Sequence, residues 1–196
     1  PLSVLFTLLK RTLIPVMNNL LSTYASNISK IILFAVASLL FTLSATAQAS
    51  ENSPATLAIK LELKQQQGEY HPPYVAAWLE NSDRKPVRTL LLWRKEPKWL
   101  KDIRRWWRNV GRKDAALVDA ITSATHAAGT FPLSFKATDD QQQSLPAGDY
   151  TLYIEVVREK GGRALLKQAF KIDNNTQKFT LNETAETGEI TFTVTP

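Results

Sequence analysis

The chain has 196 residues and contains no cysteine, one methionine and two histidines. The lack of cysteine excludes disulfide bonds, thiolate metal sites, iron–sulfur ligation and a cysteine nucleophile. A histidine-based metal site or a hydrolytic triad would have to use His71 or His126, which are far apart in the sequence. We therefore expect a protein that has no metal site and catalyses no reaction by itself.

Acidic residues are scarce in one part of the chain, and basic residues gather there. The formal net charge is +6 at pH 7, and residues 84–113 hold twelve lysines and arginines against two acidic residues. Such a separation of charge predicts a local basic face, whereas a protein that coats nucleic acid would be basic throughout. We expect no nucleic-acid partner.

A secretory leader is predicted over residues 17–49. Lys30 precedes an apolar run over residues 31–43, and small residues with A-x-A spacing follow it. This is the layout of a cleaved signal peptide, and the run is shorter than the roughly 20 residues of a membrane span. We expect cleavage after Ala49, export to the periplasm and no transmembrane segment in the mature protein. Residues 1–16 are interpreted as an over-extended start.

After residue 50, apolar and polar residues alternate as they do in half-buried β-strands. Strands are predicted over residues 55–64, 74–80, 87–94, 130–136, 150–158, 164–172, 178–181 and 189–195. The first three are expected to be consecutive antiparallel strands. Seven or eight short strands with turn signals between them are typical of an all-β, immunoglobulin-like antiparallel sandwich, so residues 50–196 are predicted to form one such domain behind the signal-peptide helix.

A helical insertion interrupts the strands at about residues 97–122. Trp99, Ile103, Trp106 and Val110 recur at helical spacing, and Asp114 is a suitable N-cap for a second short helix. Three interpretations of the first helix remain open. It can cap an open end of the sandwich with its apolar stripe buried, dock on an acidic partner or anionic lipid, or hold a flavin between a tryptophan ring and arginines. The residues considered for binding are Arg104, Arg105, Arg108, Trp106 and Trp107.

Residues 129–156 resemble the hairpin of flagellar-hook-capping-type immunoglobulin-like modules. A strand leads to a turn with Asp139 and Asp140, and Pro146, Gly148 and Tyr150 then open the next strand. We expect the aspartates to hydrogen-bond nearby backbone and Tyr150 to bury its ring. The segment is interpreted as structural.

Further motifs point to a family. They are HPPYVAAWLE from His71, LLLWR from Leu90, KWLKDIRRWWR from Lys98 and VDAITSATHAAG from Val118. With them, the chain from about residue 55 to its end resembles the predicted periplasmic proteins of domain-of-unknown-function family 2271. The resemblance implies an exported protein found near PepSY-type inner-membrane proteins and the periplasmic flavin transferase, in iron uptake or electron transfer.

The segment Asp119–Thr125, with the sequence DAITSAT, is similar to the acceptor motif to which the flavin transferase attaches flavin mononucleotide (FMN). The resemblance implies that Thr125 is the acceptor and that Asp119 and Thr122 are recognition residues. Ser123 stands where the motif usually has glycine. The alternative is a serine- and threonine-rich loop that only closes the helical insertion.

These observations predict an exported accessory or binding protein of a flavin-linked redox or iron-acquisition assembly. Its expected partners are a PepSY-type inner-membrane protein and the flavin transferase. Two alternatives remain open: a covalent FMN carrier modified at Thr125, and a protein-interaction module that docks through the basic, tryptophan-rich helix.

Overall fold

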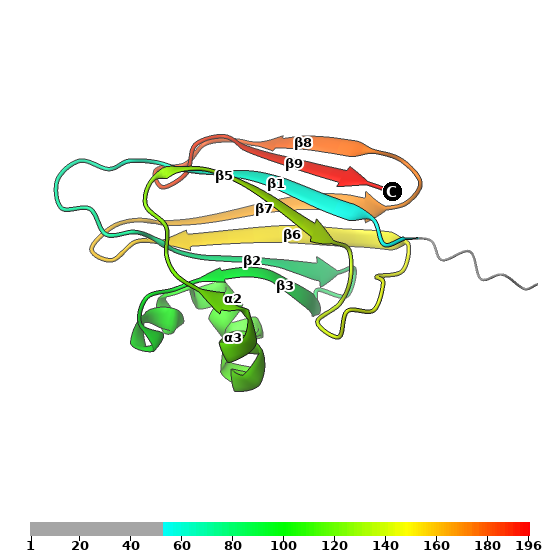
Figure 1. Ribbon diagram of the computed structural model, residues 1–196, viewed down its shortest axis with the longest axis horizontal. Coiled ribbons are helices and arrows are strands. Elements are labelled where there is room, and N and C mark those ends of the chain that lie inside the picture. The colour runs from blue at the N-terminus through cyan, green and yellow to red at the C-terminus, as the bar shows by residue number, and fades with distance from the viewer. Residues whose placement is uncertain (1–52) are drawn as a thin grey trace, which may run out of the picture. The chain divides into compact units, whose positions relative to one another are not determined.

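Residues 53–196, the part of the chain described by the computed structural model, form nine strands in two sheets together with a helical insertion. The predicted over-extended start and signal peptide lie outside these residues. One sheet has the order β5-β1-β9-β8 and the other the order β4-β3-β2-β6-β7 (Figure 1). The all-β sandwich with a helical insertion is confirmed. The strands are β1 (Thr56–Leu63), β2 (Tyr74–Asn81), β3 (Pro86–Trp93), β4 (Thr122–Ser123), β5 (Gly129–Lys136), β6 (Gly148–Val157), β7 (Arg163–Ile172), β8 (Gln177–Leu181) and β9 (Ile190–Thr195).

The core between the sheets follows from the alternation of side chains. Leu57, Ile59 and Leu61 of β1 are buried and pack in the same cluster as Leu152 and Ile154 of β6. Because successive side chains of a strand point to opposite faces, one apolar set from each sheet meets its counterpart across the sandwich.

Two pairing predictions are wrong. Strand β1 pairs with β5 and β9, so only β2 and β3 of the first three strands are neighbours. Strands β5 and β6 belong to different sheets, so the segment that resembles a hairpin crosses the sandwich instead. Its turn behaves as expected at Asp139 and Tyr150, since the Asp139 carboxylate accepts hydrogen bonds from two backbone N–H groups and the buried Tyr150 donates its hydroxyl to the Pro146 carbonyl. The prediction is wrong for Asp140, whose carboxylate accepts the N–H of Thr89 in β3 and not nearby backbone. The alternation of apolar and polar residues determines which face of a sheet a side chain occupies, but it does not determine which strand is the neighbour in that sheet.

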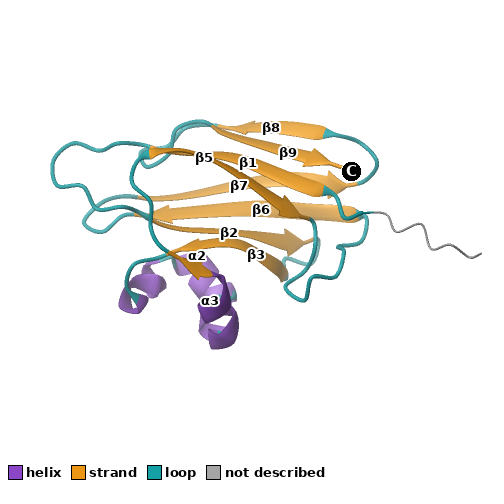
Figure 2. Cartoon of the chain, in the orientation of Figure 1, coloured by secondary structure: helices purple, strands orange, loops and turns teal. Residues whose placement is uncertain are grey.

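The helical insertion lies against the outer face of the five-stranded sheet, beside β2 and β3 (Figure 2). It consists of the 3-10 helix η2 (Pro97–Asp102), α2 (Arg104–Asn109), the 3-10 turn η3 (Gly111–Lys113) and α3 (Ala115–Ile121). The expected span and the Asp114 cap of α3 are confirmed, and the Asp114 carboxylate accepts the Leu117 N–H at 2.8 Å. The insertion covers a sheet face, however, and not an open end of the sandwich.

This cover explains why β2 is buried on both faces. Val75 and Leu79 point into the sandwich, while Ala76 and Trp78 point toward the insertion.

Within residues 53–196, no helix is long and apolar enough to cross a bilayer.

Candidate functional site

The apolar stripe of the insertion forms a second core on the outer face of the sheet. Ile103 and Trp106 are fully buried, and Val110 is almost so. The Trp106 indole N–H donates to the hydroxyl of the buried Thr89 at 3.1 Å. Trp106 is therefore an anchor of the insertion, and its prediction as a surface-binding residue is wrong. Trp99 packs only partly against this cluster.

Two buried carboxylates of the sheet hold the start of α2. Glu155 of β6 accepts the backbone N–H groups of Arg105 and Trp106, each at 3.0 Å, and forms an ion pair with Arg163 at 2.7 Å. Glu80 of β2 pairs with Arg105 at 2.8 Å. Both glutamates are at most 1% exposed, so their charges depend on these partners.

The Arg105 side chain is consequently engaged in contacts within the protein. Its guanidinium bonds the Glu80 carboxylate and lies over the Tyr153 ring, 4.2 Å from the centroid. The expectation that Arg105 belongs to a docking surface is wrong for this reason. Arg104 and Arg108 remain exposed, and Trp107 is half-buried. Sequence reasoning missed Glu80 and Glu155, because each reads as the polar member of an alternating strand.

The predicted flavin-acceptor segment runs from α3 through β4 into an irregular loop. Strand β4 pairs in parallel with β3, which places Ser123 beside Trp93. Arg94 joins the two predicted recognition residues: its Nε donates to the Thr122 hydroxyl at 3.0 Å, and its Nη2 lies 3.6 Å from the Asp119 carboxylate. Arg94 was not predicted as a site residue, although it ends the LLLWR motif.

Thr125 lies in the loop after β4, where several small side chains face solvent. Ser123, Ala124 and Ala127 are exposed, and Thr125 is half-buried. The neighbouring His126 ring lies 4.4 Å from the buried Trp93 ring, measured between centroids. His126 therefore packs on an aromatic side chain of β3.

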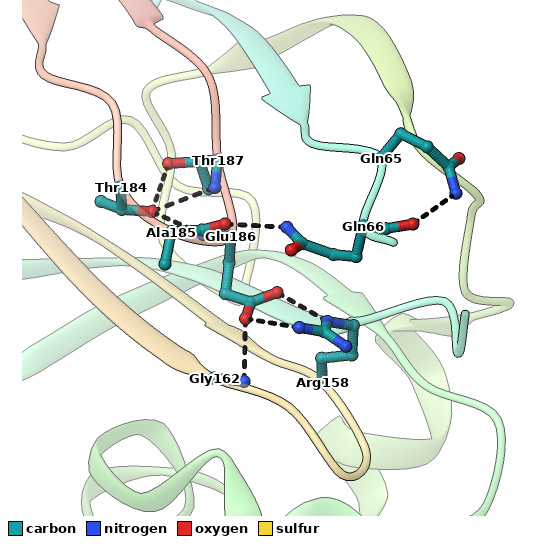
Figure 3. Close-up of polar contacts among 8 residues, drawn as sticks. All are labelled: Gln65, Gln66, Arg158, Gly162, Thr184, Ala185, Glu186 and Thr187. Carbon is teal, nitrogen blue, oxygen red and sulfur yellow. Dashed lines mark hydrogen bonds and ion pairs between the residues drawn. The ribbon is translucent and has the colours of Figure 1, made fainter. Parts of the chain in front are cut away.

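One end of the sandwich is closed by a buried ion pair that joins the two sheets (Figure 3). Glu186, between β8 and β9, accepts hydrogen bonds from the Arg158 guanidinium at 2.9 Å and from the Gly162 N–H at 2.8 Å. Arg158 and Gly162 belong to the turn between β6 and β7, in the other sheet. The carboxylate stabilises the charged guanidinium and so raises the pKa of Arg158 above its ordinary value. The figure also shows Gln66 donating to the Ala185 carbonyl. We interpret the cluster as structural.

Replacing Glu186 by glutamine is expected to lower the free energy of unfolding by about 1.5–3 kcal/mol, because the charge-assisted hydrogen bonds become neutral or are lost. Urea denaturation measures the change. Glu183→Gln, in the same loop but exposed, is the matched control and should leave the midpoint unchanged. Equal losses of unfolding free energy in the two variants would contradict the assignment of Glu186 to a contact that joins the two sheets.

The two histidines are separate features. His71 lies 3.1 Å from the Glu69 carboxylate in the loop after β1, and His126 packs on Trp93. Among the residues that the structure describes, no group of three histidine or acidic side chains could hold a metal ion.

Comparison with known proteins gives one match. The model of a family described as "Predicted periplasmic protein (DUF2271)" matches residues 56–189. This segment contains the insertion, the acceptor segment and Glu186, and it agrees with the family and the periplasmic location predicted from the sequence. No curated protein and no solved structure matches the chain.

Proposed function

Because the chain belongs to this family of predicted periplasmic proteins, we propose that it is an accessory protein of a flavin-linked redox or iron-acquisition assembly and carries FMN covalently on Thr125. The observation that supports the proposal most is the setting of the acceptor segment. Thr125 follows β4, and Arg94 contacts both proposed recognition residues, Asp119 of α3 and Thr122 of β4. Thr125 also lies among small, exposed side chains.

The acceptor loop fits the group that it would carry. A transferase must bring a bulky flavin phosphate to the Thr125 hydroxyl, and the exposed Ser123 and Ala124 leave room for that approach. Ser123 replaces the usual glycine, but it is not among the residues with positive φ, so its backbone does not require glycine. The departure from the motif is therefore compatible with attachment.

Different residues of the chain would have different roles in flavin attachment. The Thr125 oxygen would attack the flavin-side phosphorus of a flavin adenine dinucleotide held by the transferase: the phosphoester to FMN forms, the pyrophosphate bond breaks, AMP leaves, and the hydroxyl proton passes to a base of the transferase. Arg94 would hold Asp119 and Thr122 in place for recognition. The half-buried Phe131, near Trp93 and His126, offers apolar surface close to the loop. A bound flavin accepts and releases electrons, so the protein would carry them without catalysing a reaction by itself. A PepSY-type inner-membrane protein and the flavin transferase are the proposed partners.

Thr125→Ala is expected to abolish flavin attachment completely, because no acceptor oxygen remains. The protein is co-produced with a flavin transferase, and its intact mass and visible absorption are recorded. Ser123→Ala, which changes an exposed hydroxyl two residues away, is the matched control and should keep the added mass of one FMN ester. The proposal fails if the unmodified sequence gains no mass while a known acceptor protein is modified in the same cells.

A further inference from the structure

A pocket of about 400 Å³ lies between the insertion and the turn that joins β6 to β7. Its wall includes Tyr74, Trp99, Asp102, Arg104 and Val157, together with residues 158–163. Thr125 is not part of this wall. We propose that the pocket binds, without covalent attachment, a nitrogen heterocycle that carries a phosphate or carboxylate group. This inference does not depend on flavin attachment to Thr125.

The apolar part of the pocket is suited to a planar ring. Trp99 packs in part against the outer core, and the Lys98 ammonium lies 5.2 Å from the centre of its ring. The Tyr74 hydroxyl accepts the Glu96 N–H at 2.8 Å, which fixes the position of the phenol ring. Rigid aromatic side chains bury a planar ligand at little entropic cost, and the pocket volume falls within the range of about 300–1,000 Å³ that is usual for small-molecule sites.

The charged part of the pocket favours an anionic group. Arg158 and Arg163 are each paired with a buried carboxylate, Glu186 and Glu155, so their charges are largely balanced and Arg104 is the group on this wall that can bind an anion. The exposed Arg104 has no carboxylate within ion-pair distance among residues 53–196, and an anionic group can therefore bind its guanidinium directly. Lys160 is exposed and lies 3.6 Å from the Glu69 carboxylate.

Two acidic residues on the same wall restrict the ligand further. Asp102 and Glu159 would repel a ligand that is only an anion. A heterocycle with N–H groups can donate to one of these carboxylates while its anionic group meets Arg104. The arrangement therefore favours a ring with both donors and a negative charge over inorganic phosphate.

The test uses the Thr125→Ala chain, in which any bound flavin is not attached through that hydroxyl. FMN, riboflavin and inorganic phosphate are titrated by calorimetry. FMN is expected to bind at least about tenfold more tightly than riboflavin, which lacks the phosphate, and phosphate alone is expected to bind weakly. Adding Arg104→Gln should weaken FMN binding about tenfold.

Arg108→Gln removes the same charge one turn away and is the matched control. It should leave FMN binding unchanged, because Arg108 is not part of the pocket wall. The inference is overturned if FMN does not bind, if riboflavin binds as tightly, or if Arg108→Gln weakens binding as much as Arg104→Gln. A native chain that gains FMN covalently while the Thr125→Ala chain binds none would overturn only this inference.

Discussion

Replacing Glu155 by leucine is expected to lower the free energy of unfolding by about 3–5 kcal/mol, because a buried ion pair and its hydrogen bonds are broken together. Glu155 is fully buried, and its carboxylate accepts the backbone N–H groups of Arg105 and Trp106. In the leucine variant these two N–H groups lose their acceptor and Arg163 loses its partner. Equilibrium urea denaturation gives the size of the loss.

The matched control for this change is Glu159→Leu, four residues further along the chain and exposed. It should have little effect on stability, because no buried residue among 53–196 forms an ion pair with Glu159. Hydrogen exchange adds a local test, since the amides of Arg105 and Trp106 should exchange faster in Glu155→Leu than in Glu159→Leu. If both variants unfold at the same urea concentration, Glu155 does not anchor the insertion.

Trp106→Ala is expected to cost about 3–5 kcal/mol of stability, as removal of a fully buried tryptophan usually does. Its indole lies so close to Gly111 that a Cβ at that position would come within 2.6 Å of the ring. The alanine variant leaves a cavity there and removes the donor that bonds the Thr89 hydroxyl. Thermal or urea unfolding measures the change.

The neighbouring tryptophan provides the comparison. Trp107 is only half-buried, so Trp107→Ala should cost clearly less than Trp106→Ala. Trp106→Phe keeps most of the ring and should fall between the two. If Trp107→Ala is the more destabilising change, the assignment of Trp106 to the outer core is wrong.

Most of the strands were predictable because they have one buried face, whereas β2 is buried on both. In β1 and β9 the buried residues follow a period of two, which the sequence displays directly. Strand β4 was not predictable, since two residues carry no period and their pairing depends on β3. The partners of β1 were not predictable either, because residues 129–136 and 190–195 are distant in the sequence.

The candidate site was predictable only in part. Helical spacing identified Ile103, Trp106 and Val110 as one stripe, and all three are buried. The same spacing placed Arg105 on the opposite, solvent side, but Glu80 lies where its guanidinium can pair. Such a pair forms between residues 25 positions apart, and its existence depends on the placement of the helix on the sheet.

The acceptor segment shows the same limit. The motif from Asp119 to Thr125 is local and could be read from the sequence, whereas the role of Arg94 depends on β4 lying beside β3. The contacts of Glu186 with Arg158 and Gly162 join the two sheets, and no local sequence pattern indicates them. Local patterns therefore indicated the helices, the strands and the proposed acceptor segment, whereas the residues that hold them in place are brought together by tertiary contacts.

Fragmentation mass spectrometry of one tryptic peptide shows whether Thr125 carries FMN, as we propose. Cleavage after Lys113 and Lys136 releases residues 114–136, which contain Thr125 together with Thr122 and Ser123. The chain is co-produced with a flavin transferase, and the fragments locate the added mass. We predict one FMN ester on the Thr125 oxygen; a peptide that carries no flavin, or carries it on Thr122 or Ser123, would contradict the claim.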